Sequence, residues 1–208
     1  MKRNRLFIAI LCLALAAVLV SCAEEKTETT KTENTKTETA ATTSTAAPAE
    51  APAAKPAKVL SFDSETIEGE KIADDYYKGY DVILVNFMST TCPPCVKEIP
   101  ELQEIHEENN GFGVIGFVAD TVDRKTGEKK STLIDDARNI KEKTGALYPF
   151  VLPTLDIFNV AMGKLVPVFP MSYIVDNTGK VIKGPIAGAH SKAEWLDLLE
   201  EARNSISL

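Results

Sequence analysis

The feature that most constrains this chain is a Cys-Pro-Pro-Cys motif, Cys92–Cys95, placed between two segments of different periodicity. Before it, Val82–Met88 is an apolar run rich in β-branched residues, which predicts a strand buried on both faces. After it, apolar residues recur at helical spacing, which predicts a helix from about Pro93 to Glu108. The sequence therefore places a pair of cysteines at a strand-to-helix junction.

Each residue of the motif has a physical reason to stand there. Cys92 is expected at the helix N-cap, where free N–H groups and the helix dipole stabilise a thiolate, the reactive form of cysteine. Pro93 suits the first helical position and Pro94 stiffens the first turn. Cys95, one turn later, can attack a mixed disulfide formed by Cys92 and release the product. This pattern predicts a catalytic dithiol.

The remaining chain alternates between strand and helix patterns. Other strands are expected at 59–62, 66–72 and 114–119, with a hairpin of 171–175 and 180–183. Further helices are expected at 131–143 and 156–162, and a last one opens at Ser191, where Glu194 completes a capping box. Trp195, Leu198, Leu199 and Ala202 are expected to face the core. This order indicates an α/β thioredoxin fold, with a mixed central sheet flanked by helices.

Charge and cysteine count exclude several classes of function. The formal net charge is −7 without a basic patch, so nucleic acid is not an expected partner. Of the four cysteines, Cys12 and Cys22 lie in the N-terminal apolar segment or at its end. One remaining C-x-x-C pair supplies neither a disulfide scaffold nor a four-cysteine zinc site. We expect no metal and no cofactor, because two thiols can carry the electrons.

The N-terminus has the pattern of an export signal. Basic residues precede the apolar run Leu6–Val20, which is too short to span a bilayer comfortably. Its end, Leu19–Cys22, resembles the lipobox of bacterial lipoproteins, which implies cleavage after residue 21 and lipidation of Cys22. Residues 22–56 are rich in Lys, Thr, Glu, Ala and Pro and predict a disordered tether. The expected organisation is a signal at 1–21, the tether at 22–56 and one domain at 57–208.

The motif Cys-Pro-Pro-Cys-Val-Lys-Glu98-Ile-Pro100 resembles the C-x-x-C-x-x-E-x-P pattern of the TlpA/ResA-like branch of the thioredoxin superfamily. The likeness extends over about Val59–Ser205. It implies an N-terminal β extension and an inserted helix within Asp120–Tyr148. In that branch the equivalent of Glu98 assists proton transfer and tunes the cysteine pKa values. An ordinary solvated glutamate on an amphipathic helix is the alternative for Glu98.

A second matching element is the segment Val168–Ile174. In the family, a cis-proline begins the third central strand, faces the C-x-x-C motif and leaves the preceding backbone free to pair with substrate. The resemblance implies that Phe169 and Pro170 have this substrate-positioning role, with Pro167 as the competing proline. Proline is tolerated at the first residue of a strand, and cis bonds occur almost only before proline.

The sequence departs from the family at several positions. Asn86 stands where cytosolic thioredoxins have a buried, proton-accepting Asp, so proton transfer shifts to Glu98 or water. Met88 and Thr91 replace two tryptophans that commonly precede the first cysteine. His106 is expected to be a solvated residue of a Glu-rich helix, and His190 to cap or line the last helix.

The resemblance implies an extracytoplasmic, lipid-anchored thiol–disulfide reductase that is re-reduced by a membrane thiol donor of the CcdA or DsbD kind. Substrates would be oxidised proteins, with apocytochrome c among the candidates, as in cytochrome c biogenesis. The outer leaflet of the cell membrane is the favoured location, the outer membrane is a second one, and a monomer is expected.

Other functions fit the same residues. A disulfide-forming oxidase would use the same site in the opposite direction, because direction depends on reduction potential and partner. A thioredoxin-fold adaptor would not depend on Cys92, and a copper-delivery protein would bind Cu(I) when reduced. A peroxiredoxin is disfavoured, because Val85 occupies the place of the proline in its P-x-x-x-T-x-x-C pattern.

Overall fold

The fold is seen in a computed structural model, which describes residues 58–163 and 168–206. Cys22, the predicted signal and tether, and Pro167 lie outside the described residues. Among the described helices, none is both long and apolar enough to cross a bilayer.

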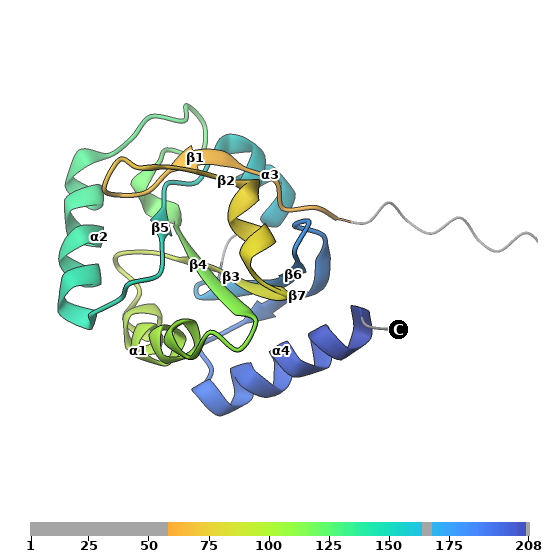
Figure 1. The fold of residues 1–208 in the computed structure, drawn as a ribbon. Coiled ribbons are helices and arrows are strands. Elements are labelled where there is room, and N and C mark those ends of the chain that lie inside the picture. Colours follow the sequence, from red (N-terminus) through yellow and green to blue (C-terminus); the bar gives the residue numbers. More distant parts are fainter. Residues whose placement is uncertain (1–57, 164–167, 207–208) are drawn as a thin grey trace, which may run out of the picture. The chain divides into compact units, whose positions relative to one another are not determined.

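A five-stranded sheet with the order β5-β4-β3-β6-β7 forms the centre (Figure 1). Its strands are β3 (Val82–Met88), β4 (Phe112–Val118), β5 (Phe150–Val151), β6 (Met171–Asp176) and β7 (Val181–Ala187). The β3, β4 and β5 strands run parallel, and β6 and β7 are antiparallel to their neighbours. All residues of β3 and β4 are buried, as expected for strands covered on both faces. The predicted mixed sheet is confirmed.

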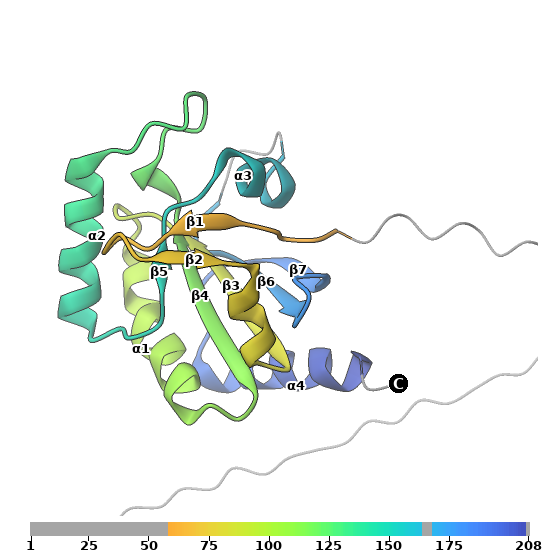
Figure 2. The same cartoon turned by 45° about the horizontal axis from the view of Figure 1, so that its top comes forward.

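In the described residues the helices around the sheet are α1 (Pro93–Glu108), α2 (Ser131–Thr144), α3 (Leu155–Ala161) and α4 (Lys192–Ile206), with α2 packed beside α1. Helices α1 and α4 lie side by side on one face, while α3 lies on the other (Figures 1 and 2). The Ser191–Glu194 capping box forms, with the Ser191 N–H donating to the Glu194 carboxylate over 2.8 Å. Trp195, Leu199 and Ala202 are buried as predicted, and Leu198 is half-buried at the edge of the core.

The N-terminal extension differs from the prediction. The predicted strand at 59–62 is absent, and only Val59 forms an isolated bridge, with Lys180. The predicted strand at 66–72 is wrong, because its first half is the turn of a hairpin between β1 (Asp63–Glu65) and β2 (Lys71–Ala73). Gly69 sits in this turn at φ +93°, a conformation that L side chains rarely adopt. A 3₁₀ helix, η1 (Asp74–Gly79), follows.

The long connection after β4 contains the expected inserted helix. It opens with the 3₁₀ helix η2 (Ala119–Thr121), passes through a loop and continues as α2. Helix α2 ends at Gly145, which adopts the left-handed conformation at φ +71°. The insertion thereby places its first residues, at the C-terminal end of β4, beside the turn that precedes Cys92.

Candidate active site

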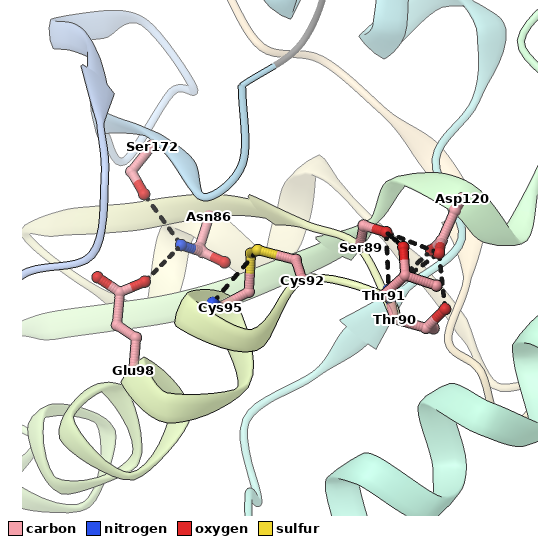
Figure 3. Close-up of a disulfide and its surroundings, with 9 residues drawn as sticks. All are labelled: Asn86, Ser89, Thr90, Thr91, Cys92, Cys95, Glu98, Asp120 and Ser172. Atoms are coloured by element: carbon pink, nitrogen blue, oxygen red, sulfur yellow. Dashed lines mark hydrogen bonds between the residues drawn. A yellow bond between two sulfur atoms is a disulfide. The ribbon is translucent and has the colours of Figure 1, made fainter.

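The two cysteines of the motif are joined by a disulfide at the N-terminus of α1 (Figure 3). Cys92 is the N-cap of the helix, and its Sγ accepts a hydrogen bond from the N–H of Cys95 at 3.3 Å. Pro93 and Pro94 occupy the first two helical positions, where no intrahelical partner for an N–H is lost. This local geometry confirms the predicted strand-to-helix placement of the pair.

The two sulfurs differ in accessibility. Cys95 is 2% exposed and belongs to the hydrophobic core, whereas Cys92 is half-buried. An incoming disulfide can therefore reach Cys92 but not Cys95. This asymmetry fits a nucleophile at Cys92 and a resolving thiol at Cys95.

Glu98 lies one turn after Cys95 and is buried, with 3% of its surface exposed. Its Oε1 accepts hydrogen bonds from the His190 N–H at 2.8 Å and from the Trp195 Nε1–H at 2.9 Å. Its Oε2 accepts from Asn86 Nδ2 at 3.3 Å. Burial raises the pKa of Glu98 above its usual value, and these donors oppose that shift only in part. The alternative of a solvated surface glutamate is therefore wrong.

Asn86 links Glu98 to the neighbouring strand. Its Nδ2 also donates to Ser172 Oγ at 3.0 Å, and the two residues face each other in the β3–β6 ladder. Both are buried. The position where cytosolic thioredoxins carry a titratable Asp is thus filled by a neutral hydrogen-bond bridge, so Glu98 is the titratable group of this cluster.

The peptide bond between Phe169 and Pro170 is cis, and Pro170 lies directly before β6. This matches the residue chosen from the sequence, while the competing Pro167 is outside the described residues. Pro170 is buried and Phe169 half-buried. The carbonyl of Pro170 accepts a hydrogen bond from the Gly188 N–H at 2.9 Å. The substrate-positioning role of Phe169 and Pro170 stays a prediction.

A polar cluster on the other side of the disulfide was not anticipated from the sequence. Asp120, in η2, accepts hydrogen bonds from Ser89 Oγ at 2.8 Å and from Thr90 Oγ1 at 2.6 Å. The Thr90 N–H donates to the same carboxylate at 3.0 and 3.1 Å, and Thr91 Oγ1 lies 3.1 Å from Ser89 Oγ. In the sequence, Thr91 stands out only as the replacement for a tryptophan. The sequence pattern that could have predicted this cluster is the run of three hydroxyl residues directly before Cys92.

The two histidines have different surroundings. His106 is not a solvated residue as predicted: it is half-buried between the rings of Tyr80 and Tyr148, with centroids 6.5 and 6.2 Å away. Burial lowers the pKa of His106. His190 lies before α4, and its ring packs on Trp195 at 4.7 Å. The expectation that His190 lines the last helix is confirmed.

Two cavities flank the motif. One, of about 390 Å³, is lined by Pro94, Lys97, Glu98, Glu101 and residues 189–191. Glu98 forms part of the wall of this cavity. The other, of about 380 Å³, contains Phe169, Asp120 and the cations Arg124, Lys125 and Lys130. Within the described part of the chain, no three His, Cys, Asp or Glu side chains converge on a point that could hold a metal ion.

The fold and the dithiol site define a thioredoxin-like thiol–disulfide oxidoreductase. The chain belongs to the AhpC/TSA family, whose pattern matches residues 54–183.

Among curated relatives, it is 28% identical over 157 residues to sporulation thiol-disulfide oxidoreductase A of Bacillus subtilis (strain 168), covering 72% of this chain and 86% of that protein. It is 28% identical over 137 residues to thiol-disulfide oxidoreductase ResA of Bacillus thuringiensis subsp. konkukian, covering 65% and 70% of the two chains. Among solved structures, a thioredoxin-family thiol:disulfide interchange protein from Chlorobium tepidum TLS superposes with a TM-score of 0.58 at 26% identity. That match covers 72% of this chain and 98% of the other.

Proposed function

We propose that this protein is a lipid-anchored, extracytoplasmic reductase of disulfides in other proteins, with Cys92 as nucleophile and Cys95 as resolving thiol. The observation that carries the proposal is the asymmetric pair at the α1 N-terminus, backed by the buried carboxyl of Glu98. Glu98 moves protons, and Phe169 and Pro170 align the substrate backbone.

The reaction begins from the dithiol form. The Cys92 thiolate attacks one sulfur of the substrate disulfide, and the other substrate sulfur leaves as a thiolate and takes up a proton. Cys95 then loses its proton to the Glu98 carboxylate and attacks Cys92 Sγ, which releases the second substrate thiol. Two electrons have passed to the substrate, and the protein is left with the Cys92–Cys95 disulfide seen in the structure.

The environment of Glu98 supports the proton-transfer role. A general base or acid works best when its pKa lies near the working pH, and burial moves the pKa of Glu98 upward from 4.5. The cavity beside Glu98 supplies an exit for the proton.

The location and partners rest on the sequence and on the relatives. The lipobox-like Leu19–Cys22 supports a lipid anchor at Cys22, on the outer leaflet of the cell membrane. A membrane dithiol donor of the CcdA or DsbD kind would regenerate the reduced form. Relatives named thiol-disulfide oxidoreductase support disulfides as substrates. The resemblance to the ResA-like branch makes apocytochrome c the first substrate protein to test.

The test is reduction of a protein disulfide by the full-length protein in detergent with a dithiol donor. We expect wild type to turn over, Cys92→Ser to be inactive and Cys95→Ser to accumulate a mixed disulfide with substrate. Activity that survives Cys92→Ser would contradict the proposal and favour an adaptor. Stoichiometric Cu(I) binding without disulfide reduction would favour metal delivery.

A further inference from the structure

The turn before Cys92 is hydrogen-bonded to a single carboxylate, that of Asp120. Asp120 accepts hydrogen bonds from the hydroxyl groups of Ser89 and Thr90 and from the Thr90 N–H. The Thr91 N–H donates in turn to Ser89 Oγ at 3.3 Å, and the Cys92 N–H donates to the Ser89 carbonyl at 3.2 Å. Ser89 therefore connects Asp120, through its hydroxyl, with the Cys92 backbone, through its carbonyl. Figure 3 shows the side-chain bonds between Asp120 and the turn.

Asp120 is hydrogen-bonded to a residue that lies two positions before Cys92 in the chain. Thr90, which binds Asp120 through both backbone and side chain, is two residues from Cys92, a Cα separation of at most about 7.6 Å. Among the described residues, no cation forms a salt bridge with Asp120, although Arg124, Lys125 and Lys130 line the same cavity. The hydrogen-bond partners of Asp120 are neutral hydroxyl and amide groups.

Other ionisable groups near the motif lie in α1 and in the segment before α4. Glu98 is held by its own donors and lies on the opposite side of the disulfide (Figure 3). Lys97 is exposed, and His190 points its ring onto Trp195. Asp120 is thus the carboxylate fastened to the turn that leads into Cys92.

We propose that Asp120 is a positioning residue that fixes the β3–α1 turn and whose charge disfavours the Cys92 thiolate, which makes the cysteine pair more reducing. The inference rests on the proposed reductase function and deepens it. In the couple, a disulfide plus two electrons and two protons gives two thiols. Stabilising a thiolate favours the reduced form and makes a pair more oxidising. A nearby negative charge acts in the opposite direction.

The discriminating variant is Asp120→Asn in the full-length protein. The amide keeps an acceptor for the Thr90 N–H and can donate to the two hydroxyls, so the turn is retained while the charge is lost. We expect the equilibrium constant with glutathione to move about threefold toward the dithiol form, equivalent to about 14 mV. The Cys92 thiol should also alkylate faster at a given pH below its pKa.

The matched control is Ser89→Ala with Thr90→Val, which removes hydroxyl partners and keeps the charge. We expect its equilibrium constant to stay at the wild-type value or move toward the disulfide. A merely structural role would move both variants the same way. If Asp120→Asn leaves the constant unchanged, or if the double variant moves toward the dithiol, the inference is overturned. Failure of wild type to form the Cys92–Cys95 disulfide would instead contradict the proposed function.

Discussion

Two carboxylates, Glu98 and Asp120, lie on opposite sides of the disulfide, and their surroundings differ (Figure 3). Glu98 is almost fully buried, and its donors come from β3, α4 and the segment before α4. Asp120 is half-buried, and its donors come from two consecutive residues of one turn. The same chemical group therefore stands in two settings: burial raises the pKa of Glu98, which suits the proposed proton transfer, while local hydrogen bonds hold Asp120 against the turn.

The largest expected effect comes from removing the sulfur that both carboxylates flank. Cys92→Ser should reduce disulfide-reductase activity to the uncatalysed rate, because no thiolate remains to attack the substrate. Cys95→Ser is the matched control, since it keeps the nucleophile. It should trap a mixed disulfide visible on a non-reducing gel, and a trapped complex in Cys92→Ser instead would reverse the assigned roles.

The next largest effect should distinguish Glu98, the proposed proton-transfer group, from Asp120, which has no such role. Glu98→Gln should slow turnover by about 10²-fold near neutral pH and flatten the pH dependence of kcat, because a general acid–base group contributes about that factor. Asp120→Asn should not flatten that profile, and should only move its thiolate-dependent limb toward lower pH. If Asp120→Asn flattened the pH profile of kcat and Glu98→Gln did not, the proton-transfer role would belong to Asp120 and not to Glu98.

Glu98 should also make stability depend on pH. Its pKa in the folded protein is raised above the usual 4.5, so its contribution to stability is fully present below pH 4.5. That contribution is lost as the pH rises through the folded-state pKa, because the unfolded chain releases the proton first. In denaturant titrations, the unfolding free energy of wild type minus that of Glu98→Gln should decline as the pH rises. Parallel pH dependences would contradict the assignment.

A smaller effect tests the support of Glu98 by Trp195. Trp195→Phe removes the donor to Oε1 and some ring volume, and should lower the free energy of unfolding by about 2–3 kcal/mol. The same change in the Glu98→Gln background should cost less, since the partner is already neutral. Equal costs in both backgrounds would show that only packing is lost.

The smallest effect concerns the anchor side. Thr90→Val removes one hydroxyl donor to Asp120 and keeps the backbone N–H bond, so unfolding free energy should fall by about 1 kcal/mol. The pH profile of turnover should not change. A shift of that profile as large as the one from Glu98→Gln would show that the turn takes part in proton transfer.

Patterns within one segment of the chain predicted much of this fold. The buried strand Val82–Met88, the helix to Glu108 and the capping box at Ser191 follow from local spacing and appear with those bounds. The structure of the N-terminal region could not be predicted in this way, because the hairpin turn at 66–69 interrupts a stretch whose apolar residues resemble a strand. There the turn residues determine the local structure, although the composition of the segment favours a strand.

Some residues of the site could likewise be predicted from local patterns, and others could not. The positions of Cys92, Cys95 and the cis Phe169–Pro170 bond could be assigned from motifs. The partners of Glu98 and Asp120 could not, since they come from segments up to 97 residues apart that only the folded sheet brings together. His106 was misassigned for the same reason: the aromatic rings that cover it belong to distant segments.

The most direct test of the central claim is the reduction potential of the Cys92–Cys95 couple, measured by equilibration of the full-length protein with glutathione or dithiothreitol. A reductase waiting for a membrane donor should give a value near that of thioredoxin, about −270 mV. A value near about −120 mV, in the range of a strong oxidant, would contradict the account and indicate a protein that forms disulfides.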